Sequence, residues 1–254
     1  MVKKYIFEKA REEKGDAQYD KISKEYAEIS QNDPSKLFVQ YPEAFRLLGD
    51  IKGKSILDIG CGNGYFAEQL VKNGADVTGY DISKKQIDKA NASKDKHKLD
   101  IIYTVSSPEN FSVGTRFDKA VSILVLLYAE SKENLTAFFE SAFKHLKKSG
   151  EFVVITFNPN FSRLGETVYN RRFSKADDGK IKAEFINDEG NTTFSVLFTD
   201  FSSEDYEQSA KEAGFENFRW DKLRVSPEGI EKMREGFWDN YEDDCPYMAI
   251  VVKK

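Results

Sequence analysis

The sequence has few of the side chains that build disulfide frameworks and metal centres, with two cysteines and two histidines in 254 residues. Cys61 and Cys245 lie far apart, outside any CxxC pair or histidine–cysteine cluster, so neither a disulfide framework nor a zinc site is predicted. His97 precedes an apolar run and His145 lies late in a helical pattern, where solvated or helix-terminal roles are expected. A histidine general base is therefore not predicted, and the catalytic residue stays unknown.

The sequence also lacks a large excess of charge of one sign. Lys and Arg number 38 against 43 Asp and Glu, the net charge is −5, and both signs are mixed along the chain. Because there is no basic stripe of the kind that binds a nucleic-acid backbone, a nucleic-acid partner is disfavoured. The acids Glu130, Glu133 and 242–244 are interpreted as solvated loop charges, so no metal site is predicted.

Long apolar runs are absent as well. The longest, residues 120–129, is too short to cross a bilayer of about 30 Å as a helix and is interpreted as a central strand with the residues after it. Residues 1–9 lack the continuous apolar core of a signal peptide. We therefore expect a cytoplasmic protein with no membrane partner; its oligomeric state, monomer or homodimer, is left open.

What the sequence does contain is a cluster of glycines at the end of an apolar run, in residues 55–64. The acid Asp58 lies in this run, and Gly60, Gly62 and Gly64 follow at alternate positions. This pattern is typical of a buried parallel strand that breaks into a loop where a ligand lies directly on the main chain. A helix begins after the loop, and its free N–H groups favour binding of a carboxylate.

A second acid, Asp81, ends the next apolar run, where a carboxylate can accept hydrogen bonds from two ribose hydroxyls. Loop and acid together predict a nucleoside cofactor across the carboxyl ends of two neighbouring strands. The dinucleotide fingerprint requires a third glycine at position 65, where this chain has Tyr65. The spacing therefore favours a ligand smaller than a nicotinamide dinucleotide.

Strand and helix patterns alternate from Ser55 onward, which predicts an α/β fold with a doubly wound parallel sheet. Between about residues 160 and 200 the pattern changes to that of a β-hairpin. The expected strands are 55–59, 76–80, 100–105, 118–124, 151–157, 180–186, 192–198, 216–222 and 247–252. The expected helices are 64–73, 84–93, 132–147, one from Ser202 or Ser203 to Ala213 and one from Pro227.

Residues 57–64, with the sequence Leu-Asp-Ile-Gly-Cys-Gly-Asn-Gly, resemble the glycine motif of the class I S-adenosylmethionine-dependent methyltransferases. The resemblance implies a mostly parallel, Rossmann-like sheet of seven strands, whose last two strands form an antiparallel hairpin at the edge. It also implies S-adenosyl-L-methionine as cofactor and S-adenosyl-L-homocysteine as product. Residues 19–26, 213–220 and 225–229 further resemble small bacterial small-molecule methyltransferases such as the toxoflavin-biosynthesis N-methyltransferase.

On this resemblance we expect a single methyltransferase domain over residues 1–254. Its parts are an N-terminal helical lid (1–40), a cofactor-binding core (41–160), a small β-hairpin cap that inserts over the substrate (161–200) and a C-terminal sheet edge (201–254). Many family members carry an acid after the third strand that accepts from the adenine amino group. Ser107 stands there in this chain, so a serine hydroxyl or a backbone group is the expected adenine contact.

The resemblance places the cofactor against the lid and the carboxyl ends of the strands, at Tyr19, Tyr26, Asp58, Gly60, Cys61, Gly62, Asn63, Gly64, Asp81, Ile82, Ser106, Ser107, Ile123 and Leu124. Tyr19 and Tyr26 lie one heptad apart and are expected to close over the sulfonium. The residues expected to bind the acceptor are Tyr41, Tyr128, Asn158 and Tyr169. Aromatic side chains between residues 158 and 201 suit a flat acceptor, but they equally suit the hairpin's own core.

The leading hypothesis is an S-adenosylmethionine-dependent enzyme that methylates a nitrogen or oxygen of a small aromatic or heterocyclic molecule. Within the same fold, the alternative is methylation of a quinone precursor or of a small amine such as glycine. From other classes, a non-catalytic nucleoside-binding module and a nicotinamide-dependent oxidoreductase are kept. The missing third glycine weighs against the oxidoreductase, and the expected aromatic lid weighs against the binding module.

Overall fold

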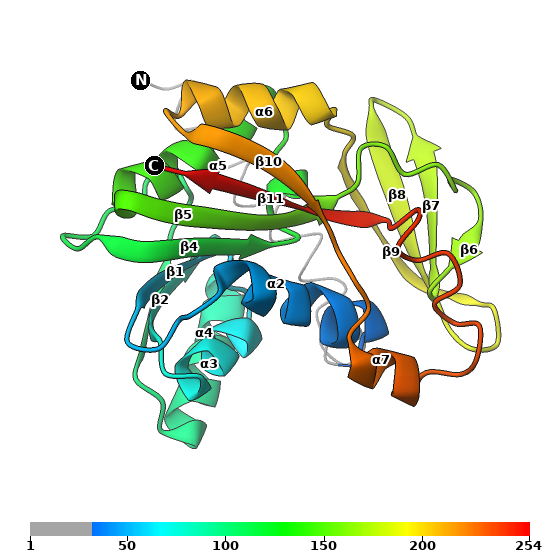
Figure 1. Cartoon of the computed structure of the whole chain (residues 1–254), viewed down its shortest axis with the longest axis horizontal. Coiled ribbons are helices and arrows are strands. Elements are labelled where there is room, and N and C mark those ends of the chain that lie inside the picture. Colours follow the sequence, from blue (N-terminus) through cyan, green and yellow to red (C-terminus); the bar gives the residue numbers. More distant parts are fainter. Residues whose placement is uncertain (1–31) are drawn as a thin grey trace.

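A seven-stranded sheet forms the centre of the computed structural model, which describes residues 32–254 (Figure 1). The strand order is β10-β11-β5-β4-β1-β2-β3. Five neighbouring strands run parallel: β1 (Ser55–Ile59), β2 (Asp76–Asp81), β3 (Ile101–Val105), β4 (Phe117–Ile123) and β5 (Leu146–Phe157). β11 (Tyr247–Lys253) pairs antiparallel with both β5 and β10 (Glu216–Lys222). The predicted doubly wound sheet with a terminal antiparallel hairpin is confirmed.

Helices cover both faces of this sheet (Figure 1). On one face lie α2 (Tyr41–Leu48), α3 (Tyr65–Lys72) and α4 (Lys84–His97), and on the other lie α5 (Lys132–His145) and α6 (Ser203–Glu212). Alternate residues of each strand serve the two cores, so that Ile56 packs with the first group and Leu57 with the second. Among the described residues, no helix is both long and apolar enough to span a membrane.

Three short helices lie at the carboxyl edge of the sheet. η1 (Lys36–Gln40) is one π-helical turn that continues into α2, and η2 (Leu126–Tyr128) is a 3-10 turn after β4. α7 (Pro227–Lys232) follows β10 and packs on η1. The predicted start of this helix at Pro227 is confirmed, and Ser226 caps it by accepting from the Gly229 N–H.

A second, antiparallel sheet lies beyond the carboxyl ends of the parallel strands (Figure 1). Its strands, in order, are β6 (Thr167–Val168), β7 (Arg171–Ala176), β8 (Lys180–Ile186) and β9 (Thr192–Thr199). The predicted hairpin is β8–β9, and β6 and β7 extend it to four strands. We call this unit the small sheet.

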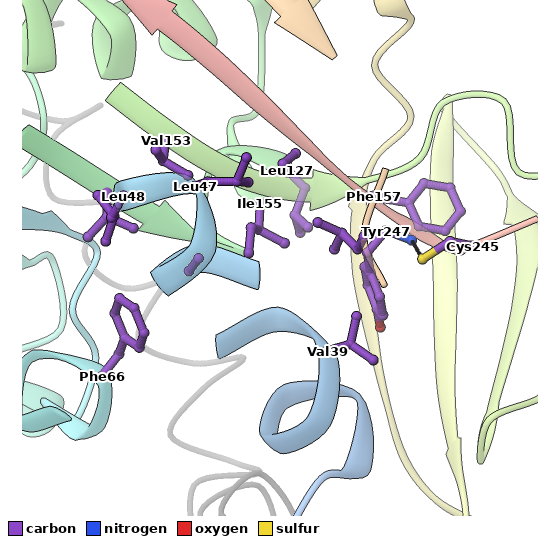
Figure 2. Packing of buried hydrophobic residues seen from close by; sticks show 14 of the residues in the cluster. Val39, Leu47, Leu48, Phe66, Leu127, Val153, Ile155, Phe157, Cys245 and Tyr247 are labelled. Carbon is purple, nitrogen blue, oxygen red and sulfur yellow. Dashed lines mark hydrogen bonds between the residues drawn. The ribbon is translucent and has the colours of Figure 1, made fainter. Parts of the chain in front are cut away.

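The core of the small sheet is continuous with that of the large sheet. The ring of Phe157, at the end of β5, lies 5.1 Å from the rings of both Phe173 and Phe198. Phe157 pairs with Tyr247 of β11, and both belong with Val39 of η1 to one buried cluster, of which Figure 2 shows part. Aromatic residues of the cap therefore build its core, the second of the two interpretations left open from the sequence.

Two predicted helix ends and the predicted start of one strand are wrong. The helix expected over 132–147 ends at His145, and β5 begins at Leu146 because Leu146 pairs with Phe117 ahead of a register shift in β4. Ser149 takes up the irregularity with a left-handed φ of 64°. The helix expected over 84–93 runs on to His97, whose ring nitrogen Nδ1 lies 2.9 Å from the Glu68 carboxylate.

Candidate cofactor-binding site

The glycine loop after β1 is tied to the end of β2 by its main chain. The N–H groups of Gly60 and Cys61 both donate to the Tyr80 carbonyl, over 2.8 and 3.0 Å. Gly60, Gly62 and Gly64 have φ angles of 72°, 53° and 81°, in the left-handed region that favours glycine. The loop therefore folds back over the carboxyl ends of two adjacent strands, as the sequence predicted.

The three glycines are needed for different reasons. A Cβ at Gly60 would lie 2.5 Å from the Val125 side chain, and one at Gly64 would lie 2.3 Å from the Tyr103 hydroxyl. At Gly62 a Cβ would meet nothing within 4 Å. Packing inside the protein thus requires the first and third glycines, whereas the middle one leaves open space into which a ligand can approach the main chain.

Asp81 joins the loop to the start of α4. Its carboxylate accepts from the N–H of Gly62 over 2.9 Å and from the N–H of Ser83 over 2.8 Å, and Ser83 in turn caps α4. Ile82, the next residue, leaves 53% of its surface exposed. An ionised acceptor beside an exposed apolar side chain suits a ribose with its attached base.

Asp58 lies behind the loop, and its buried carboxyl group lacks a hydrogen-bond partner for one oxygen among the described residues. Its side chain is 3% exposed, and the unpaired oxygen is Oδ2. Burial, with the neighbouring charge of Asp81, raises the pKa of Asp58 to about 7. Because burying an unpaired carboxylate costs free energy, this group fits a ligand that carries an ammonium group.

The start of α3 faces the same loop. Gly64 is its N-cap without a side-chain cap, while Asn63 accepts weakly from the Tyr65 N–H over 3.4 Å. Free N–H groups at a helix start favour a carboxylate. The Cys61 thiol points away toward Gly79, and burial raises its pKa, so this residue takes part in the loop through its main chain.

The residues expected around the adenine and at the end of β4 have mixed roles. The Ser106 N–H donates to the Asp81 carbonyl, its hydroxyl donates to the Ser107 carbonyl, and the Ser107 hydroxyl accepts from Asn110. Both hydroxyls thus have local partners, which favours a backbone adenine contact. Ile123 ends β4, and Leu124 turns the chain with a φ of 55° while donating to the Ile155 carbonyl.

Of the four residues expected to bind the acceptor, Tyr41 lies beside the loop. Its ring stacks on Tyr65, with 5.5 Å between centroids, and on Phe66, with 5.2 Å. Tyr128 of η2 lies 6.5 Å from the Phe198 ring and so connects the large sheet to the small sheet. Both side chains are half-buried.

Asn158 and Tyr169 have clear structural partners. The Asn158 amide donates to the Cys245 carbonyl and accepts from the Asn160 N–H. The Tyr169 hydroxyl donates to the Asp239 carbonyl, and Tyr169 lines a cavity of about 210 Å³ between the β6 region and residues 234–240. Their expected role in acceptor binding stays a prediction, and Tyr19 and Tyr26 lie outside the described residues.

Sequence reasoning missed Tyr103, which supports the loop from β3. Its hydroxyl donates to the Gly64 carbonyl over 3.3 Å, and its ring lies beneath Gly79. The alternation of β3 was the available signal, since it puts Tyr103 and Val105 on one face. Within residues 32–254, no three His, Cys, Asp or Glu side chains converge as metal ligands.

Comparisons with known proteins agree with this geometry. A family model described as a methyltransferase domain matches residues 33–219. The chain is 36% identical over 108 residues to a ubiquinone biosynthesis O-methyltransferase of Pelagibacter ubique, covering 42% of this chain and 44% of that protein. It is 29% identical over 136 residues to the enzyme of the same name from Rickettsia conorii, covering 52% and 46%. The chain thus spans less than half the length of these relatives.

Solved structures share the fold over most of the chain. An S-adenosylmethionine-dependent methyltransferase from Clostridium acetobutylicum superposes with a TM-score of 0.62 at 18% identity, covering 92% of this chain and 98% of the other. CalS10, an amino pentose methyltransferase from Micromonospora echinaspora solved with its S-adenosylmethionine, gives 0.58 at 17% identity, covering 87% and 90%.

Proposed function

This chain belongs to the methyltransferase family whose domain spans residues 33–219 and has the fold of the class I S-adenosylmethionine-dependent enzymes, and we propose that it methylates a nitrogen or oxygen of a small, flat molecule. The observation that carries the proposal is the buried Asp58 carboxylate, unpaired behind a loop whose central glycine faces open space. That combination suits a nucleoside ligand with an amino-acid end.

The residues present fit the cofactor part by part. Asp81 would hold the ribose hydroxyls and Ile82 the base, while Asp58 would pair with the ammonium group and the start of α3 with the carboxylate. When bound, S-adenosylmethionine carries a methyl group already activated by its positively charged sulfur. The chain's own residues then have to align the acceptor and exclude water.

The acceptor is proposed to be aromatic or heterocyclic and uncharged at the reacting face. Support comes from the half-buried Tyr41 ring, which stacks on Tyr65 directly after the loop and offers a flat apolar wall. The partial relatives are named O-methyltransferases, and CalS10 is named for an amino sugar, so oxygen and nitrogen are both kept.

A quinone precursor is the second candidate acceptor. The observation that favours it is the 36% identity, over 108 residues, to a ubiquinone biosynthesis O-methyltransferase. A dihydroxylated aromatic ring also fits a flat wall beside the cofactor loop. Methyl transfer to a catechol, followed by mass spectrometry, separates this candidate from a nitrogen acceptor.

The cofactor assignment is tested by thermal shift. S-adenosylhomocysteine should stabilise the protein, by about 2.7 kcal/mol at a concentration one hundred times its Kd, because it binds the native state alone. NADH should leave the melting temperature unchanged, since Tyr65 replaces the third glycine of the dinucleotide loop. Stabilisation by NADH without any response to S-adenosylhomocysteine would contradict the proposed function.

A further inference from the structure

Four of the buried polar atoms that have no hydrogen-bond partner among the described residues belong to two segments at the carboxyl edge of the sheet. One is the cofactor loop with Asp58, described above. The other is η1 with its N-cap: Ser35 Oγ and both amide atoms of Gln40 have no hydrogen-bond partner in the part of the chain that the structure describes, and both side chains are 0% exposed. A buried unpaired amide is costly, so a native protein that keeps one needs a partner for it.

The chain on either side of Gln40 fixes where this amide lies. Tyr41, the next residue, stacks on Tyr65 directly after the glycine loop. Val39, the residue before, belongs to the cluster that holds Phe157 and Tyr247 at the end of β5 (Figure 2). Gln40 thus lies in the chain between a residue of the shared core and a residue that packs on the start of α3. It also ends a π-helical turn, a feature frequent at functional sites.

The segment is anchored by a buried ion pair that leaves no net charge. Asp33 accepts from the Ser35 N–H over 3.0 Å with one carboxylate oxygen and pairs with Arg171 of β7 over 2.6 Å with the other. Both side chains of the pair are at most 4% exposed. This pair adds no net charge to the segment that carries Gln40, which is compatible with an uncharged ligand.

We propose that Gln40 recognises the methyl acceptor, and that the acceptor is an uncharged ring with a lactam edge. This inference rests on the proposed function. A carboxamide presents an N–H donor next to a carbonyl acceptor, and a lactam presents the complementary pair, so that one ligand edge satisfies both orphaned atoms of Gln40. The ring plane of such a molecule suits the aromatic wall of Tyr41.

The test uses two fluorescent probes with the same ring system. 2-Quinolinone has one lactam edge, and 1-methyl-2-quinolinone has the same shape without the N–H. Each is titrated into the full-length protein saturated with S-adenosylhomocysteine. We expect 2-quinolinone to bind about tenfold more tightly, because the methylated probe leaves a buried acceptor unpaired.

The Gln40→Met variant keeps the side-chain volume and removes both polar atoms. Its melting temperature without ligand should equal or exceed that of the wild type, because the amide it loses is unpaired. It should still bind S-adenosylhomocysteine and should bind both quinolinones with the same weak affinity. Gln208→Met, on exposed α6 far from the loop, is the matched control and should keep the preference for 2-quinolinone.

Three outcomes would overturn the inference. They are equal binding of the two probes by the wild type, an unchanged preference in Gln40→Met, and a melting temperature of Gln40→Met that falls by several degrees, which would give Gln40 a structural partner. Failure of the wild type to bind S-adenosylhomocysteine would instead contradict the proposed function. The two failures are therefore read from different measurements.

Discussion

At the scale of single residues, two carboxylates at the ends of neighbouring strands have opposite environments. Asp81 is half-buried and accepts from two backbone N–H groups, whereas Asp58 is buried with one oxygen unpaired. Backbone donors favour the charged form of Asp81, and desolvation favours the neutral form of Asp58. The first acid is therefore ready to accept hydrogen bonds, and the second needs a cation before it ionises readily.

Replacing Asp81 by alanine is expected to weaken S-adenosylhomocysteine binding by roughly 1.5 to 3 kcal/mol, since the ligand loses a charged acceptor in a partly desolvated site. The loss also frees the Gly62 N–H that the carboxylate holds. Isothermal calorimetry measures the affinity, and circular dichroism checks that the variant is folded. Asp76→Ala, at the exposed start of the same strand, should bind as the wild type does. Unchanged affinity in a folded Asp81→Ala would remove Asp81 from the site.

The raised pKa of Asp58 predicts a pH-dependent affinity. In the free protein this carboxyl keeps its proton up to about pH 7, well above its ordinary value of 3.8, so its contribution to stability falls as pH rises between those values. In the proposed complex, the ammonium group of the cofactor pairs with the ionised form. Affinity for S-adenosylhomocysteine should therefore rise between about pH 5 and 7, by up to about tenfold per unit, and then level off.

Calorimetry in buffers of different ionisation enthalpy detects the proton that Asp58 releases on binding. In Asp58→Asn, which is neutral at every pH, both the rise in affinity and the proton release should disappear. A wild-type affinity that does not change over this pH range would show that Asp58 does not pair with the ligand.

At the scale of elements, the sequence predicted the features that depend on residues close together in the chain. The glycine loop, the five parallel strands, the capped start of α6 at Ser202 and the β8–β9 hairpin follow from spacing and turn chemistry. The π turn of η1 and the early start of β5 do not, because each depends on a distant partner: Arg171 for the segment around Asp33, and Phe117 for Leu146. For the same reason, the sequence could not tell that Val125 and Tyr103 dictate Gly60 and Gly64.

The ion pair that joins this N-terminal segment to the small sheet is expected to be costly to break on one side. Asp33→Asn leaves the Arg171 guanidinium buried against the Phe185 ring without its counter-charge, which should destabilise the fold by about 3 to 5 kcal/mol. Urea denaturation followed by circular dichroism measures the effect. Asp33→Leu combined with Arg171→Met should recover much of the loss, because no charge is then buried.

The exposed pair of Lys84 and Asp88 on α4 is the matched control, and Asp88→Asn should change stability little. A double variant as unstable as Asp33→Asn alone would argue that the contacts of the side chains, not their charges, hold the segment in place.

At the scale of the whole molecule, one core runs through both sheets. Phe157 contacts Phe173 and Phe198 across the junction, and Thr199 donates to the Ala129 carbonyl beyond η2. The small sheet and the large sheet bury apolar side chains against each other in this way. Separating the two sheets would expose this apolar area to water and lose its hydrophobic stabilisation. The single domain expected from the sequence is consistent with this packing and has a direct test in unfolding.

The two tryptophans of the chain report on the two sheets separately. Trp220 of β10 packs 5.7 Å from the Tyr206 ring, and Trp238 stacks 5.8 Å from Tyr169 at the small sheet. Trp238→Phe leaves a probe of the large sheet, and Trp220→Phe leaves a probe of the small one. In each variant the fluorescence midpoint in urea should equal the midpoint from circular dichroism, because one continuous core unfolds cooperatively.

Saturating S-adenosylhomocysteine should raise both fluorescence midpoints together, although its proposed site lies at the carboxyl edge of the large sheet, because binding to the native state stabilises every part that unfolds with it. Comparison of the two signals within each variant removes the effect of the substitution itself. If Trp238 reported a transition at lower urea that the ligand left unmoved, the small sheet would be an independent folding unit. The junction at Phe157 would then be a docking contact between two domains.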